Sequence, residues 1–289
     1  MRTLQPGQRC EVWIVSVTGE RRLACSTDNL LLEAPNWTLD GDALILNGDG
    51  KLWRLDATAG ASPQAIHLTG VPDLNNDHVL DPDGKGIYVS ANDGHIYRAP
   101  LAGGAATRIT PDDGTWHFLH GVSPDGAELA YVGLDGGFTQ PGRLMTIPAA
   151  GGPPEAVDVG AGHCDGPEYS PDGTWIYLNT ESFTTAPGHA QLARVRRDGS
   201  GFERLVASET VDWFPHLSPD GRFASYLRFP QGTEGHPADL PVDVVLVSTS
   251  DWETPLHAWP LFGGQGTLNV NSWSPDSTRF AYVAYPLGG

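Results

Sequence analysis

Short apolar runs recur along the whole chain, separated by turns rich in glycine and proline. Runs of this kind, four to six residues long, occupy 43–46, 86–89, 128–132, 175–178, 223–227 and 279–284. They are too short for buried helices, and no segment shows the 3.6-residue periodicity of a long amphipathic helix. Many short strands joined by tight turns are typical of an all-β chain.

A turn of the type Ser-Pro-Asp-Gly precedes each of these runs. Its third position is occupied by Asp40, Asp83, Asp125, Asp172, Asp220 and Asp276, which are 43, 42, 47, 48 and 56 residues apart. Proline presets the second position of such a turn, and glycine accepts the left-handed conformation at its end. We therefore assign the six aspartates a structural role. A repeat of this length containing about four strands is typical of a propeller blade. The repeats predict a six-bladed β-propeller in which residues 1–289 form a single domain.

The two ends of the chain complement each other in this scheme. The sixth repeat stops after its second strand, whereas two surplus strands, near 11–17 and 21–26, precede the first repeat. An open ring would expose unpaired strand edges, which can pair with other chains, and closing the ring removes these edges. We predict that the N-terminal strands complete the C-terminal blade.

The repeat resembles that of the TolB-type propellers. The match lies in the Ser-Pro-Asp-Gly turn, the apolar run after it, and a later strand followed by Gly-Gly, as at 103–104 and 151–152. This resemblance implies the fold, but family members serve as adaptors, enzyme gates and enzymes. Its oligogalacturonate-lyase-like members hold a metal in a histidine-rich axial pocket, which implies that a similar pocket is worth seeking here.

The net charge of −18 limits the choice of partners. Binding of nucleic acid or of an anionic membrane surface needs clustered Lys and Arg, so we exclude both. No apolar run approaches the ~18 residues of a membrane span. The first residues contain no hydrophobic leader segment, which predicts a cytoplasmic protein as the sequence stands. A chain from which a leader had been removed would instead be periplasmic or secreted.

Residues that could bind a metal or transfer protons cluster just before the turns, where the innermost strand of each blade should line the central channel. We expect His78, His120 and His216 to converge there as ligands of a divalent metal, with Mn, Zn, Fe and Ca all open. Asp165, Asp212 and His236 are the candidates for proton transfer. His78, His120, Asp165, Asp212 and His216 should border one axial pocket, on the face opposite the six turns. The alternative is a water-filled channel without chemistry.

Further residues near the expected channel mouth are candidates for binding a ligand. They are Glu33, Asn76, Asp77, His163, Trp213, Gln265 and Asn269. Three long loops, at 135–140, 181–189 and 228–237, should form a wall on one side of this mouth.

Two functions fit this pattern. The first is an enzyme, a hydrolase or a lyase, that uses a metal or histidine to act on a polar, carbohydrate-like small molecule. The second is a non-catalytic propeller that binds a peptide or protein on the same face. The concentration of His and Asp at the axis favours the enzyme.

Overall fold

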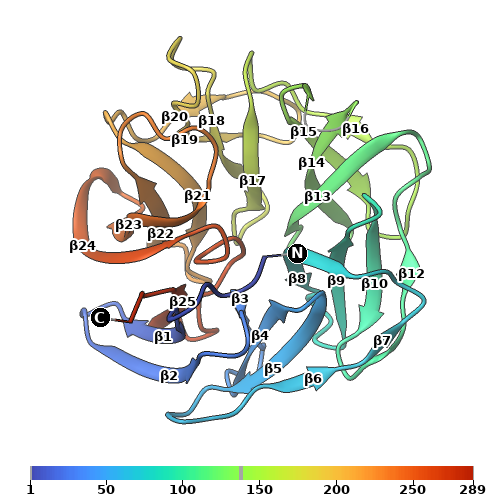
Figure 1. Cartoon of the computed structure of the whole chain (residues 1–289). Coiled ribbons are helices and arrows are strands. Elements are labelled where there is room, and N and C mark those ends of the chain that lie inside the picture. The colour runs from blue at the N-terminus through green and yellow to red at the C-terminus, as the bar shows by residue number, and fades with distance from the viewer. Residues whose placement is uncertain (1, 137–138, 289) are drawn as a thin grey trace.

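The repeats form a ring of six blades around a central axis (Figure 1). This computed structural model describes residues 2–136 and 139–288. It confirms the predicted all-β, six-bladed propeller. In the described residues, no helix has the length and apolar character needed to cross a membrane.

Five blades consist of four antiparallel strands each, with the innermost strand first in sequence. Their strands are β3 (Glu33–Trp37), β4 (Ala43–Gly48), β5 (Lys51–Asp56) and β6 (Gln64–Ile66); β8 (Leu74–Leu80), β9 (Gly86–Ala91), β10 (Ile96–Pro100) and β12 (Thr107–Arg108); β13 (Thr115–Val122), β14 (Glu128–Asp135), β15 (Arg143–Pro148) and β16 (Glu155–Ala156); β17 (Cys164–Tyr169), β18 (Ile176–Thr180), β19 (Gln191–Val195) and β20 (Glu203–Arg204); and β21 (Val211–Leu217), β22 (Phe223–Phe229), β23 (Ala238–Ser248) and β24 (Asp251–Gly264). A short parallel pair, β7 (Leu68–Thr69) and β11 (Gly104–Ala105), links the first two blades at the rim.

The sixth blade is built from both ends of the chain. Strand β1 (Cys10–Ser16) lies between β2 (Arg21–Thr27) and β25 (Arg279–Ala284). Its antiparallel register with β25 runs from Glu11 opposite Ala284 to Ser16 opposite Arg279. Apolar side chains of β1 and β25 pack against the first blade in one buried cluster. The N-terminal segment therefore supplies both hydrogen bonds and core to the last blade.

The hydrogen bonds shared by the turns explain why each turn contains an aspartate. In the fourth repeat, Ser170 Oγ donates to Asp172 at 2.6 Å, and the carboxylate accepts the amide of Thr174 at 2.9 Å. Equivalent hydroxyl–aspartate bonds occur in the first, third, fifth and sixth repeats. One oxygen of each of these carboxylates thus accepts hydrogen bonds within its own turn, which supports the structural assignment. The prolines of five turns line a hollow at this end of the axis.

The inner strands share an irregularity at mid-length. In all five four-stranded blades the register between the innermost strand and its neighbour shifts within the segments 33–36, 74–78, 119–121, 165–168 and 213–216. A β-bulge bends its strand and re-aims the side chains at that point. The bulges therefore decide which residues of each inner strand face the axis.

Candidate functional site

A pocket of about 410 Å³ opens at the end of the axis opposite the turns. Its volume falls within the range of small-molecule sites. Its walls come from the starts of the inner strands and from the loops above them. The lining residues are Asn75, Asn76, Asp77, Asn92, Trp116, Phe118, His120, Val132, Leu134, His163, Asp165, Trp213, Gly235, His236, Gln265 and Asn269. We call this the mouth pocket.

The bulge in β13 places His120 at the bottom of the mouth pocket. Leu119 and Gly121 pair with neighbouring residues of β14, so His120 between them is left out of the ladder. Its ring lines both the mouth pocket and the hollow on the turn side. His120 therefore lies between the two ends of the axis.

Three histidines surround the carboxylate of Asp165. The Nε2 atom of His120 lies 2.9 Å from Oδ1 of Asp165. The Nε2 atoms of His163 and His236 lie 3.6 and 3.5 Å from Oδ2. These residues come from three consecutive blades, so the packing of neighbouring blades against one another assembles the cluster.

The charges of this cluster are mutually dependent. Burial alone would lower the pKa of His120, but the carboxylates of Asp77 and Asp165 raise it to about 9. Burial would raise the pKa of Asp165, but hydrogen bonds from the imidazoles hold it well below its usual range. Burial raises the pKa of Asp77 to about 6, although His120 opposes the shift. Near neutral pH the pocket thus holds an imidazolium, a fixed carboxylate and a second carboxyl that titrates close to pH 6.

One wall of the mouth pocket was missed from the sequence. Trp116 and Phe118 lie near the start of β13 with ring centroids 6.2 Å apart, and Trp116 is 36% exposed. Val132 and Leu134 of β14 continue this apolar wall. The alternation of Trp116 and Phe118 along one strand was the available signal, because such residues share one face. Asn92 was missed because it lies in a loop outside the segments that precede the turns.

Four of the residues predicted to bind a ligand, Asn76, Gln265, Asn269 and Glu33, meet at one side of the mouth pocket. Gln265 Nε2 donates to Asn76 at 3.1 Å, and its Oε1 accepts from Asn269 at 3.3 Å and lies next to His236 Nδ1. Glu33 lines a smaller adjoining pocket that shares Asn76 and Gln265 with the mouth pocket. Gln265 therefore connects the two pockets.

The prediction that five polar residues border one axial pocket is wrong for His78 and His216. His78 pairs in register with Val89 beyond the bulge of β8, and its side chain is directed toward the neighbouring first blade, where Nδ1 contacts Asn47 of β4. Burial lowers the pKa of His78 to about 4. His216 also follows a bulge, and its ring nitrogens contact Glu168 at 2.6 Å and the carbonyl of Leu268 at 3.0 Å. Both side chains are fully buried.

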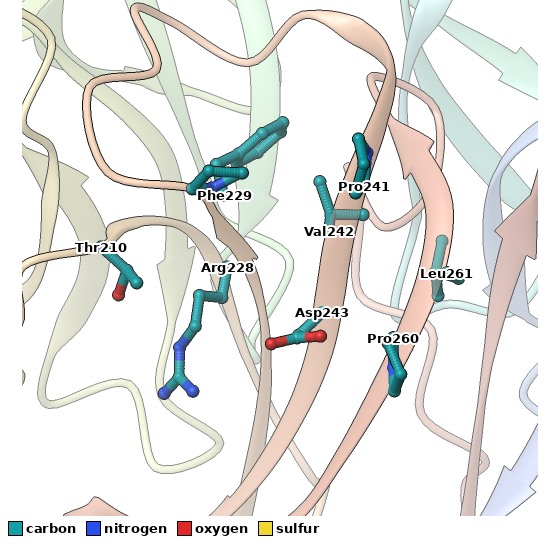
Figure 2. A pocket seen from close by; sticks show the side chains of 9 residues that line it. Thr210, Arg228, Phe229, Pro241, Val242, Asp243, Pro260 and Leu261 are labelled. Atoms are coloured by element: carbon teal, nitrogen blue, oxygen red, sulfur yellow. The ribbon is translucent and has the colours of Figure 1, made fainter.

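Asp212 is the third correction. It lies near the start of β21, the innermost strand of the fifth blade, where it accepts from Ser208 at 2.6 Å and lies 3.6 Å from Nε of Arg228. Figure 2 shows Arg228 and Asp243 on paired strands beside a hollow of the fifth blade, and no residue that lines this hollow also lines the mouth pocket. Asp212 therefore supports Arg228 and takes no part in the cluster around Asp165.

Trp213 lines the mouth pocket but offers no free ring face. It is fully buried, and the ring of His236 lies over it with centroids 4.5 Å apart. In this arrangement Trp213 packs against His236 and exposes no ring face to the mouth pocket. Of the three expected wall loops, 228–237 brings His236 and Gly235 to the pocket. In the loop 135–140, Gly137 and Phe138 lie outside the described residues.

The predicted metal ligands do not converge. His78, His120 and His216 point to different partners, and no group of three or more His, Cys, Asp or Glu in residues 2–136 and 139–288 is arranged to hold a metal. The imidazoles of the mouth pocket instead share their nitrogens with Asp165. This geometry does not fit a resident metal, and no step below is derived through one.

Comparison with known proteins places the chain among propellers of this type. No family profile matches the sequence. An uncharacterized protein of Agrobacterium fabrum is 38% identical over 260 residues, covering 88% of this chain and 85% of that protein. A solved structure from Agrobacterium tumefaciens, described as a candidate TolB, is 36% identical, covers 96% of this chain and 99% of its own, and has a TM-score of 0.88. An oligogalacturonate lyase solved with manganese shares only the fold, at 13% identity, TM-score 0.55, and coverage of 90% of this chain and 75% of its own.

Proposed function

The chain belongs to the family of TolB-like β-propellers that the Agrobacterium proteins represent, and from this premise we propose that its mouth pocket is the active site of a lyase. The substrate is a small, polar, carbohydrate-like molecule that bears a carboxylate. The observation that carries this proposal is the buried pair of His120 and Asp165, 2.9 Å apart, which shares one pocket with the carboxyl group of Asp77. The pKa of Asp77 is raised to about 6 and that of His120 to about 9, and perturbed pKa values in a cleft are typical of acid–base sites.

The reaction is a β-elimination. Ionised Asp77 removes the proton from the carbon next to the substrate carboxylate, and the electron pair forms an enediolate. The positive charge of His120, maintained by Asp165, stabilises that enediolate. The electron pair then forms a C=C bond and expels the oxygen at the next carbon, which takes a proton from an imidazolium of the cluster. His163 and His236, each about a quarter exposed, border this site, and their ring nitrogens contact Asp165, Gly142 and Gln265.

The contacts of Asp165 favour elimination over hydrolysis. A hydrolytic pair of carboxylates needs one to act as a base or nucleophile. The carboxylate of Asp165 instead contacts three histidines, so its role is to hold their rings in position. The likeness to TolB favours the periplasmic location for a chain that carried a leader. A peptide or protein bound at the same mouth is the alternative outcome of the test.

The direct test is turnover of uronate-containing oligosaccharides, including oligogalacturonate, followed by the ultraviolet absorbance of the unsaturated product. His120→Gln should lower the rate by about 10²–10³, because the charge that stabilises the enediolate is lost. His67→Gln, at an exposed position remote from the mouth, is the matched control and should not change it. Binding of these sugars with no unsaturated product would contradict the reaction. Binding of peptides alone would favour the adaptor.

The rate should depend on pH as a bell. Asp77 must be ionised to act as a base, so the rate should fall as the pH drops through about 6. His120 must be protonated to stabilise negative charge, so the rate should fall again as the pH rises through about 9. A rate that rises steadily up to pH 10 would exclude the role of His120.

A further inference from the structure

The smaller pocket beside the mouth pocket is lined chiefly by carboxamides. It measures about 200 Å³ and is formed by Arg2, Glu33, Asn47, Gly48, Asp49, Gly50, Leu74, Asn75, Asn76, Asn92 and Gln265. We call it the amide pocket. Four of its residues, Asn75, Asn76, Asn92 and Gln265, also line the mouth pocket, so the two form one continuous site.

We propose that the amide pocket is a second subsite, which binds a neutral, hydroxyl-bearing sugar unit linked to the acidic unit in the mouth pocket. This inference rests on the proposed function and extends it to the substrate class. It makes the ligand an acidic sugar joined to a neutral one.

The donors and acceptors of the amide pocket match hydroxyl groups. Each carboxamide carries N–H donors and a C=O acceptor, and a hydroxyl group can likewise donate and accept. Some of these groups already bond to the protein, as Gln265 Nε2 does to Asn76 and Asn75 Nδ2 to Asp77. Asn47 is only 2% exposed, and its Nδ2 has no hydrogen-bond partner among the described residues. A buried donor left unpaired destabilises the folded protein. A ligand oxygen reaching Asn47 would remove that destabilisation.

The charges of the amide pocket disfavour a second carboxylate. The guanidinium of Arg2 lies 3.2 Å from Glu33 and 2.9 Å from Asp239, so its charge is already paired. Asp49 remains at the rim and would repel an acidic unit. The mouth pocket instead contains three imidazoles, those of His120, His163 and His236, around Asp165. The two halves of the site therefore differ in the charged groups that they present to a ligand.

The N-terminal segment closes the amide pocket on one side. Arg2 Nη1 donates to the carbonyl of Gln265 at 2.8 Å, and its guanidinium lies 4.1 Å from the ring centroid of Tyr285. Figure 1 shows the start of the chain running from the sixth blade toward the centre of the ring, near β8. The same residue thus forms a wall of the amide pocket and holds the loop that carries Gln265.

The test compares two probes, glucuronic acid and the disaccharide glucuronosyl-xylose, by calorimetry and by ¹⁵N NMR of side chains. Both should move the ring signals of His120 and His163. The disaccharide alone should move the side-chain amide signals of Asn47 and Asn92, and it should bind at least tenfold more tightly. Asp49→Asn should improve the binding of digalacturonate relative to glucuronosyl-xylose. Asp56→Asn, at an exposed position on β5, is the matched control and should not do so.

Two failures are distinguishable. If both probes move the histidine signals with equal affinity, and the amide signals stay fixed, the second subsite is overturned while the proposed active site stands. If neither probe moves the histidine signals, the result contradicts both the proposed active site and the second subsite.

Discussion

Asp77→Asn is expected to reduce the formation of unsaturated product by about 10²–10⁴ without lowering the stability of the fold. Asn cannot accept a proton, and removing a general base typically costs this much. Burial disfavours the charged form of Asp77, so its carboxylate destabilises the folded state at neutral pH. A shift from 3.8 to about 6 corresponds to about 3 kcal/mol at most. The variant should therefore melt at the same temperature as the wild type or higher.

Two measurements decide this first prediction. Initial rates give the loss of activity, and calorimetry at pH 7.5 and pH 5 gives the stability. Because protonation already neutralises Asp77 at low pH, the gain in stability should shrink at pH 5. Asp56→Asn is again the control, with neither effect expected. A variant that retains half of the wild-type rate, or that melts well below it, would contradict the assignment of Asp77.

Deletion of residues 1–26 is expected to abolish cooperative folding. It removes β1 and β2, two of the three strands of the last blade, and leaves β25 with an open edge. It also removes buried side chains such as Val12 and Ile14, which are at most 3% exposed. Each large apolar truncation costs about 2–5 kcal/mol, and the stability of a domain is only about 5–15 kcal/mol.

Urea denaturation, with its midpoint and slope, tests this second prediction. The deletion of residues 1–7 is the matched control, because it removes Arg2 and the segment above the mouth but leaves β1 and β2 in place. The shorter deletion should unfold sharply, and the longer one should show no single transition. Equal midpoints and slopes for the longer deletion and the wild type would show that β1 and β2 are dispensable.

The sequence predicted the architecture well because its determinants are local. Each turn contains its own proline, aspartate and glycine, and each strand its own apolar run, so six repeats could be aligned without knowledge of their contacts. The structural role of Asp172 and its equivalents could be predicted for the same reason, because their partners lie within the same turn. The hydrogen bonds of these turns rarely extend beyond five residues.

The candidate site was predicted only in part because it depends on the bulges. His78 and His120 occupy the same place relative to the following turn, yet only His120 falls within a bulge and faces the axis. Whether a residue lies in or beyond a bulge is decided by backbone geometry, which the alternation of polar and apolar residues does not encode. The cluster of Asp165 with His120, His163 and His236 arises from contacts between blades, which no local pattern specifies.

The pairing of β1 with β25 also determines how the ring responds to mechanical force. In their antiparallel register, Glu11 lies opposite Ala284, next to both chain ends, and Ser16 lies opposite Arg279, farthest from them. Tension applied between the two ends would load the Gln8–Leu287 bridge first, then the Glu11–Ala284 pair and each following pair in turn. Such peeling breaks the ladder one rung at a time, so it needs less force than shearing all rungs together. Single-molecule pulling from the two ends should therefore detach the last blade at low force while the other five blades still resist.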